Sequence, residues 1–97
     1  MDNTHIELKT GTGAAITIKP GFKPSYIKVI NIEGLCTLEH TPGKMDAGKG
    51  WKQITAGTGS YISTGGITMN DDGLSFSIGT DADINVSGED LVVICLR

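Results

Sequence analysis

Apolar and polar residues alternate with period two in three short segments of the chain, HIELK (5–9), AITIK (15–19) and LSFSIG (74–79). Successive side chains of a β-strand point to opposite faces, so this pattern predicts strands with one face in the core and one in water. The residues expected to face the core are Ile6, Leu8, Ile16, Ile18, Leu74, Phe76 and Ile78.

Two further segments, SYIKVINI (25–32) and LVVICL (91–96), are more continuously apolar. This composition is typical of strands that are covered on both faces. We therefore expect both segments to be central strands of a sheet.

Turn-forming residues separate these segments at short intervals. The stretch NDDG (70–73) predicts a hairpin, because Gly73 can adopt positive φ. Glycine or proline interrupts nearly every window long enough for a helix, so we expect at most one helical turn, around 44–48. The chain is predicted to be all-β: one compact domain over residues 1–97, an antiparallel sandwich or barrel of about eight or nine short strands with no substantial helix.

The least patterned stretch is HTPGKMDAGKGW (40–51), which we expect to form the longest exposed loop. It contains G-x-x-x-x-G-K, ending at Lys49, but a phosphate-binding loop needs Ser or Thr at the next position, where this chain has Gly50. The following residues also predict a strand, not the helix whose N-terminus would receive phosphates. We therefore expect no nucleotide site.

The formal net charge of −3 is unevenly distributed. Residues 1–52 carry seven lysines and five acids, a balance of +2, whereas residues 53–97 carry one arginine and six acids, a balance of −5. A nucleic-acid-binding protein concentrates positive charge and interleaves it with aromatic residues, which are scarce here. We therefore expect no nucleic-acid partner.

Cys36 and Cys95 lie in apolar, strand-like runs, and we interpret them as two buried, reduced thiols. The N-terminal MDNTHIELKT has no apolar signal-peptide core, and no stretch reaches the roughly 18 apolar residues of a membrane-spanning helix. We therefore expect a soluble protein made in a cytoplasm, with no membrane partner.

The acidic stretch TDADINVSGED (80–90) begins like a calcium-binding loop, with acidic or amide side chains at alternate positions. Such a loop needs glycine at its sixth position and glutamate at its twelfth, where this chain has Val86 and Val92. We expect a strand instead, because alternate residues of a strand share one face. The residues expected to face solvent are Asp81, Asp83 and Asn85, and those expected to face the core are Ala82, Ile84 and Val86.

Residue types suited to catalysis are few. The histidines are His5 and His40, and with two buried cysteines they give no zinc-binding spacing. Asp71 and Asp72 occupy the predicted hairpin turn, where the backbone favours aspartate. We therefore expect no enzymatic activity, no catalytic residue, no metal site and no cofactor.

Much of the chain resembles small virion proteins of tailed bacteriophages. The stretches that carry the resemblance are TGTGAAITIKPGFKPSYIKVIN (10–31), TGGIT (64–68), GTDADINVSGE (79–89) and the closing SGEDLVVICLR (87–97). Among these virion proteins, the chain is most similar to head decoration proteins, also called cement proteins, which sit on the shell at three-fold positions.

The resemblance implies a structural protein that binds the major capsid protein on the capsid exterior as a homo-oligomer, expected to be a trimer. We expect Met1, Asp2, Asn3 and Thr4 to form either a flexible arm that orders on the capsid or a merely frayed terminus, because the start of the chain is polar and unpatterned. We expect Trp51 to be a core or interface anchor. The alternative is a receptor- or carbohydrate-binding β-module of a phage tail or fibre, with Trp51 and Tyr61 as candidates for stacking on sugars.

Overall fold

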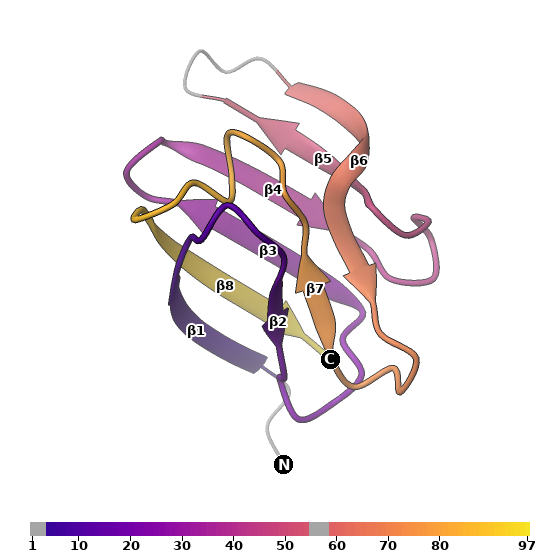
Figure 1. The fold of residues 1–97 in the computed structure, drawn as a ribbon. Helices are drawn as coiled ribbons and strands as arrows, with labels where there is room; N and C mark the ends of the chain where they lie inside the picture. Colours follow the sequence, from indigo (N-terminus) through magenta and orange to yellow (C-terminus); the bar gives the residue numbers. More distant parts are fainter. Residues whose placement is uncertain (1–3, 55–58) are drawn as a thin grey trace.

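The computed structural model describes residues 4–54 and 59–97, and in these residues the chain is all-β without a helix (Figure 1), as predicted. At 44–48, where the sequence allows at most one helical turn, the chain has hydrogen-bonded turns that begin at Thr41. None of the described segments forms a helix with the length and apolarity needed to cross a membrane. The strands are β1 (Thr4–Thr10), β2 (Ile16–Ile18), β3 (Tyr26–Asn31), β4 (Cys36–His40), β5 (Lys49–Gln53), β6 (Gly59–Met69), β7 (Phe76–Ile78) and β8 (Asp90–Leu96).

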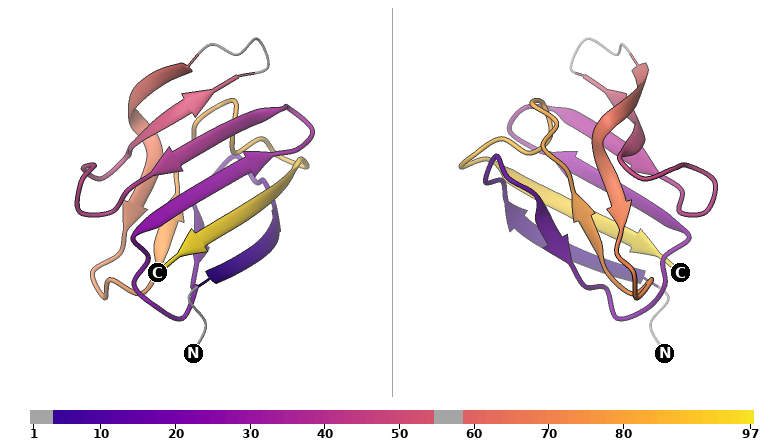
Figure 2. Two further views of the ribbon diagram at one scale, coloured as in Figure 1. Left: turned by 180° about the vertical axis from the view of Figure 1, so that it is seen from behind. Right: turned by 45° about the vertical axis from the view of Figure 1, so that its right-hand side comes forward.

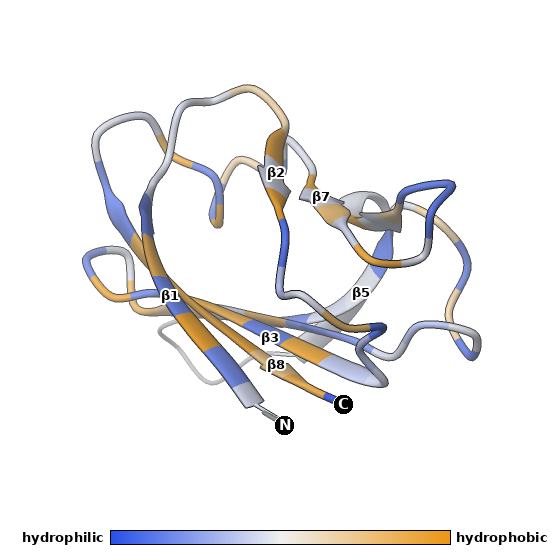
Figure 3. Cartoon of the chain, turned by 90° about the horizontal axis from the view of Figure 1, so that it is seen from below, coloured by the Kyte–Doolittle hydropathy of each residue, from blue (hydrophilic) through white to orange (hydrophobic). Residues whose placement is uncertain are grey.

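The strands form a single antiparallel sheet in the order β1-β8-β3-β4-β5-β6-β7-β2. The sheet curls into a half-barrel, so that β2 and β7 lie opposite β1, β8 and β3 (Figure 3). The choice between sandwich and barrel is therefore resolved in favour of one curled sheet, whose two edge strands are β1 and β2. As predicted, β3 and β8 have a neighbouring strand on each side.

The core fills the space inside the half-barrel. Ile18, Phe76 and Ile78 are buried as predicted, and Ile16 packs against the core. Leu74, in contrast, is 51 % exposed. The Asp72 carboxylate accepts hydrogen bonds from the backbone N–H groups of Leu74 and Ser75, so the turn extends past Leu74. The other buried apolar residues are Phe22, Ile27, Val29, Cys36, Leu38, Ile67, Ile84, Leu91, Val93 and Cys95.

Two local predictions about turns and thiols are confirmed. The hairpin at NDDG joins β6 to β7, with Met69 opposite Phe76, and Gly73 has φ of 70°. Cys36 and Cys95 are both buried free thiols. Burial raises the pKa of the Cys95 thiol to about 11.

The strand β6 bends sharply, which allows its two ends to pair with different strands. In the pairing with β5, Ile62 of β6 lies opposite Gly50, but the next residue of β5, Lys49, lies opposite Ile67. Residues 63–66 of β6 therefore bulge out between these two pairs. At the bend a Cβ on Gly66 would lie 2.5 Å from the Lys49 carbonyl oxygen, so only glycine fits there. This bend forms the corner between the β5 side and the β7 side of the half-barrel.

The loop predicted over residues 40–51 is shorter than expected, because His40 ends β4 and Lys49 begins β5. His40 is buried, and its Nδ1 donates a hydrogen bond to the Lys49 carbonyl oxygen at 2.9 Å. Burial lowers the pKa of His40. The neutral ring therefore ties the two strands together inside the molecule.

Candidate functional site

The convex outer face of the sheet is left uncovered by the other described segments (Figure 2). Figure 2, left, shows β8, β3 and β4 from this side, with no described segment lying over them. Strand pairing determines which side chains share the face, because directly opposed residues of an antiparallel pair point to the same side.

Two rows of side chains cross the outer face from β1 to β6. The register places each residue of a row directly opposite the next. The first row is Ile6, Ile94, Lys28, Glu39, Trp51 and Tyr61, and the second is Leu8, Val92, Ile30, Thr37, Gln53 and Gly59. The face is thus aliphatic at the β1 end, polar at β4 and aromatic at the β5–β6 end.

The aliphatic end, which we call the apolar patch, is formed by residues from β1, β8 and β3. Its members are Ile6, Leu8, Ile30, Val92, Ile94 and Leu96. Ile6 is 65 % exposed and Leu8 is 64 % exposed, so the prediction that they face the core is wrong. The prediction that β3 and β8 are covered on both faces is also wrong, because only their inner faces are buried. The apolar patch is therefore open to solvent in the single chain.

The strand β1 turns its charged residues toward the inside of the half-barrel. His5 Nε2 lies 2.8 Å from Glu7 Oε1, and Lys9 Nζ lies 3.1 Å from Glu7 Oε2. The hydrogen bond with His5, together with Lys9, lowers the pKa of Glu7 against the opposing effect of desolvation. Because β1 is an edge strand, these side chains keep 28–38 % of their surface exposed and remain hydrated. This orientation leaves Ile6 and Leu8 on the outer face.

The aromatic end of the face is formed by Trp51 and Tyr61, which lie directly opposite each other on β5 and β6. Trp51 is 41 % exposed and Tyr61 is 52 % exposed, so Trp51 is a surface residue and not a core anchor. The indole reaches over Gly59, where a Cβ would lie 2.3 Å from Cζ2 of Trp51. The ammonium of Lys49 lies 6.0 Å from the centroid of the Tyr61 ring.

The polar centre of the face contains a hydrogen bond from the Tyr26 hydroxyl to Glu39 Oε2. Desolvation, and then this bond to a carboxylate, raise the pKa of Tyr26 to about 12. The opposed residues Lys28 and Glu39 carry opposite charges. The centre of the face is therefore polar without a strong net charge.

The predicted N-terminal arm is only partly within the described residues. Thr4 is the first residue of β1 and pairs with Leu96, so it belongs to the sheet and not to an arm. Met1, Asp2 and Asn3 lie outside the described residues.

Within the acidic stretch 80–90, residues 81–86 do not form the predicted strand. The backbone turns at Asp81, whose carbonyl oxygen accepts from the N–H groups of Ile84 and Asn85. Lys52 Nζ lies 3.1 Å from Asp81 Oδ1 and 2.8 Å from Asp83 Oδ2. The two carboxylates that resembled calcium ligands thus bind a lysine of the same chain. These bonds, with the largest contribution from Asp83, raise the pKa of Lys52.

Asn85 is buried, contrary to the prediction that it faces solvent, and it connects the loop before β2 to the segment after β7. Its Oδ1 accepts from the N–H groups of Thr12 at 2.9 Å and Gly13 at 3.2 Å. Its Nδ2 donates to the carbonyl oxygens of Ala14 at 2.6 Å and Gly79 at 2.9 Å. The amide is fully used for structure and offers nothing to a ligand.

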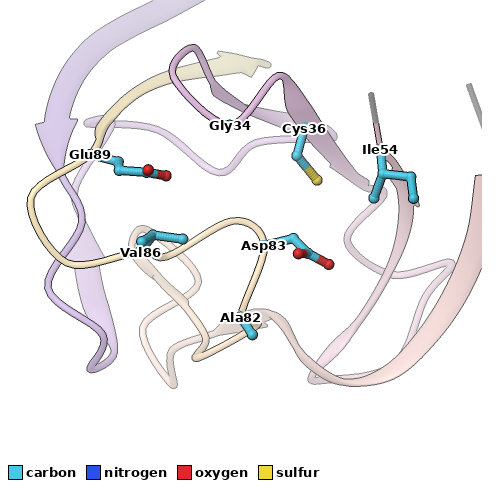
Figure 4. A pocket seen from close by; sticks show the side chains of 7 residues that line it. All are labelled: Gly34, Cys36, Ile54, Ala82, Asp83, Val86 and Glu89. Carbon is cyan, nitrogen blue, oxygen red and sulfur yellow. The ribbon is translucent and has the colours of Figure 1, made fainter. Parts of the chain in front are cut away.

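A pocket of about 410 Å³ opens beside this segment (Figure 4). Its carboxylates are already partnered, because Asp83 binds Lys52 and Glu89 Oε1 accepts from Asn31 Nδ2 at 2.9 Å. Burial raises the pKa of the Cys36 thiol, which makes it a poor nucleophile. The lining residues are Gly34, Cys36, Ile54, Ala82, Asp83, Val86 and Glu89.

The outer face, unlike the pocket, exposes both large aliphatic and aromatic side chains to solvent. Across residues 4–54 and 59–97, no group of three or more His, Cys, Asp or Glu side chains is arranged to hold a metal ion. Comparison of the chain with family models, with curated proteins and with solved structures finds no match. The outer face is the strongest candidate site on its geometry alone.

Proposed function

We propose that the protein is a non-enzymatic structural protein of a tailed-phage virion that binds the outside of the capsid and stabilises the head shell. The contact surface is the apolar patch, and the partner is the major capsid protein. The surface is inferred from the fold, whereas the identity of the partner rests on the sequence resemblance to head decoration proteins.

The observation that carries the proposal is the exposure of large aliphatic side chains on adjacent strands of one face. Scattered exposed apolar residues are ordinary, but a contiguous group is typical of a surface that another molecule covers. Removing such a surface from water contributes about 25 cal/mol for each Å² of apolar area, part of which is offset by the freedom that both partners lose on association. An antiparallel sheet that faces water normally carries polar residues on its outer side, and here that side is apolar across β1 and β8.

Trp51 and the N-terminal residues extend this contact surface in the proposal. Trp51 lies in the same cross-strand row as Ile6 and Ile94, so a partner that spans the face reaches both ends. Met1, Asp2 and Asn3 would add an arm beside the patch. Deleting these three residues is expected to weaken capsid binding, and unchanged binding would remove the arm from the proposal without affecting the role of the patch.

The direct test is co-sedimentation of the protein with empty, expanded capsids of the phage that encodes it. The Leu96→Lys variant places a charge in the apolar patch and is expected to reduce binding at least about tenfold. The control is Leu74→Lys, because Leu74 is similarly exposed but lies in the hairpin before β7. Failure of the unmodified protein to bind, or equal loss in both variants, would contradict the proposal.

A second candidate function is supported by the exposed Trp51–Tyr61 pair. Aromatic rings on a sheet surface can stack against sugars, as in a receptor- or carbohydrate-binding module of a phage tail or fibre. Trp51 is the only tryptophan of the chain, so its fluorescence reports directly on this site. Saturable quenching by polysaccharide from the host cell surface, abolished in Tyr61→Ala and accompanied by no capsid binding, would favour this function.

A further inference from the structure

The strand β1 is an open edge of the sheet. Among the described strands, only β8 pairs with it, and seven residues of β1 take part in that pairing. The opposite edge, β2, is only three residues long. A long unpaired edge is a template for another strand, because its outward N–H and C=O groups have no partner in the sheet.

Hydrogen bonds at the end of β1 show which backbone groups face the open edge. The N–H of Gly11 donates to the Glu89 carbonyl, and the Gly11 carbonyl accepts from Gly88, so both groups point toward the β8 side. Along a strand, the N–H and C=O groups of one residue point to one edge of the strand, and those of the next residue point to the other edge. The odd-numbered residues of β1 therefore bond β8, and Ile6, Leu8 and Thr10 present N–H and C=O groups to the open edge.

We propose that two copies of this chain associate by antiparallel pairing of their β1 strands, with Leu8 opposite Leu8 of the second copy. This register joins Ile6 to Thr10 of the second copy and uses about six backbone hydrogen bonds at the two-fold axis. It continues the curled sheet of one copy into the sheet of the other. The pairing concerns the edge strand alone and does not depend on a capsid.

Charge complementarity selects this register. With Leu8 on the two-fold axis, Glu7 lies opposite Lys9 of the second copy on the inner face, and the symmetry repeats this pair. With Glu7 on the axis, two glutamates oppose each other and His5 opposes Lys9, which is unfavourable. With Ile6 on the axis, the strand pairs from Thr4 to Leu8 and satisfies equally many backbone groups, but Glu7 then lies opposite His5 in place of the lysine. A shift by one residue would set inner side chains against outer ones.

The pairing also brings the two apolar patches together. Ile6 and Leu8 of both copies then form the centre of one continuous aliphatic face that extends outward to β8 and β3 on each side. A two-fold pair differs from the trimer that the resemblance implies. A dimer and a trimer differ in mass, so a mass measurement on the purified protein, without a capsid, distinguishes them.

The first test is sedimentation equilibrium of the full chain over a range of concentrations. We expect a species of twice the 10.2 kDa chain mass. Lys9→Glu sets like charges opposite each other and is expected to raise the dissociation constant at least about tenfold. The charge-swapped E7K/K9E variant restores opposite charges across the axis and is expected to recover dimerisation. Thermal unfolding of each variant at low concentration verifies the monomer fold.

The second test is disulfide cross-linking, which reports the register. Hydrogen-bonded antiparallel pairs have Cα atoms about 5.5 Å apart, within the range of a disulfide. Leu8→Cys is therefore expected to form a covalent dimer on mild oxidation. The control is Ile6→Cys, whose two copies would lie roughly 14 Å apart in this register and cannot bridge. The native cysteines are buried and do not compete.

The outcomes separate the alternatives. A monomer at concentrations up to about 1 mM, a trimer, or equal cross-linking of Leu8→Cys and Ile6→Cys would each overturn the β1 pairing. Loss of dimerisation in Lys9→Glu without recovery in E7K/K9E would also contradict it, provided that both variants are folded. None of these results affects the capsid-binding assay, which uses Leu96→Lys outside the β1 edge.

Discussion

Replacing Asn85 with alanine is expected to destabilise the fold strongly, although the residue stands in a polar, acidic stretch. The amide is 3 % exposed and makes four hydrogen bonds to backbone groups of Thr12, Gly13, Ala14 and Gly79. No single water molecule placed in the cavity left by alanine reproduces all four bonds in the same geometry. The substitution therefore releases the loop before β2 from the segment after β7.

The magnitude follows from the number and the surroundings of these bonds. Each intramolecular hydrogen bond contributes about 1 kcal/mol net, and a donor or acceptor left without a partner costs about 1–3 kcal/mol. Three of the four backbone partners belong to exposed residues and can bond to water in the variant. We therefore count each lost bond at the lower cost of about 1 kcal/mol. With four bonds, we expect the Asn85→Ala variant to lose about 4 kcal/mol of unfolding free energy, a large part of the roughly 5–15 kcal/mol of a typical domain.

The assay is denaturant unfolding monitored by the fluorescence of Trp51. The control is Asn70→Ala, because the Asn70 amide bonds the hydroxyl groups of Ser75 and Ser77 within the same hairpin and does not link distant segments in these bonds. We expect the control to lose less than about 1 kcal/mol. Equal losses for the two variants, or a loss below about 1 kcal/mol for Asn85→Ala, would refute the assignment of Asn85 as the link between the segments.

Three further predictions concern stability. Lys52→Met leaves Asp81 and Asp83 without their cation and is expected to lower the free energy of unfolding by about 2 kcal/mol in the same denaturant assay. An unchanged unfolding midpoint would mean that the ion pairs contribute nothing to stability. Gly66→Ala forces a Cβ against the backbone of Lys49 at the bend of β6 and is expected to lower the free energy of unfolding by at least about 2 kcal/mol. A thermal midpoint equal to that of the unmodified protein would contradict the close packing of Gly66 against Lys49. Because the pKa of Cys95 is raised to about 11 in the folded protein, this thiol ionises at lower pH in the unfolded chain, and the free energy of unfolding is expected to fall as the pH rises from about 9 to about 11. The fall is expected to be smaller in Cys95→Ala, and identical pH profiles of the two proteins would exclude this cause.

The strands and the hairpin could be predicted from the sequence because their signals are local. Alternation identified β2 and β7, and the apolar runs identified β3 and β8 as central strands. The NDDG turn required positive φ at a residue that is glycine, and Gly73 has it. These features depend on a few neighbouring residues, so tertiary contacts did not change them.

The orientation of β1 could not be predicted, because alternation is the same whichever face lies inward. Ile6 and Leu8 face outward since β1 lies at the edge of the half-barrel, where His5, Glu7 and Lys9 stay hydrated while facing inward. Inward charges on an edge strand are a recognised protection against uncontrolled aggregation. Knowledge of the strand order was needed before this orientation could be inferred.

The structure of the acidic segment depended on a residue far away in the chain. Alternating acids predicted a strand, but the carboxylate of Asp81 accepts from the N–H of Asp83, which favours a turn. Lys52 then binds both carboxylates across the molecule. The sequence contains no local signal that Lys52 pairs with these two carboxylates.

The two proposed interfaces differ in their physical character, and salt concentration separates them. The apolar patch carries no ionisable side chain, so burial of its aliphatic surface should be insensitive to salt or strengthened by sulfate. The β1 pairing depends on Glu7 and Lys9 near solvent, whose attraction is screened when the Debye length falls from about 10 Å at 0.1 M to about 3 Å at 1 M salt. We therefore expect 1 M sodium chloride to weaken dimerisation while leaving capsid binding per chain largely intact. If capsid binding fell in parallel with dimerisation, the capsid would be recognising the paired face and not the patch of a single chain.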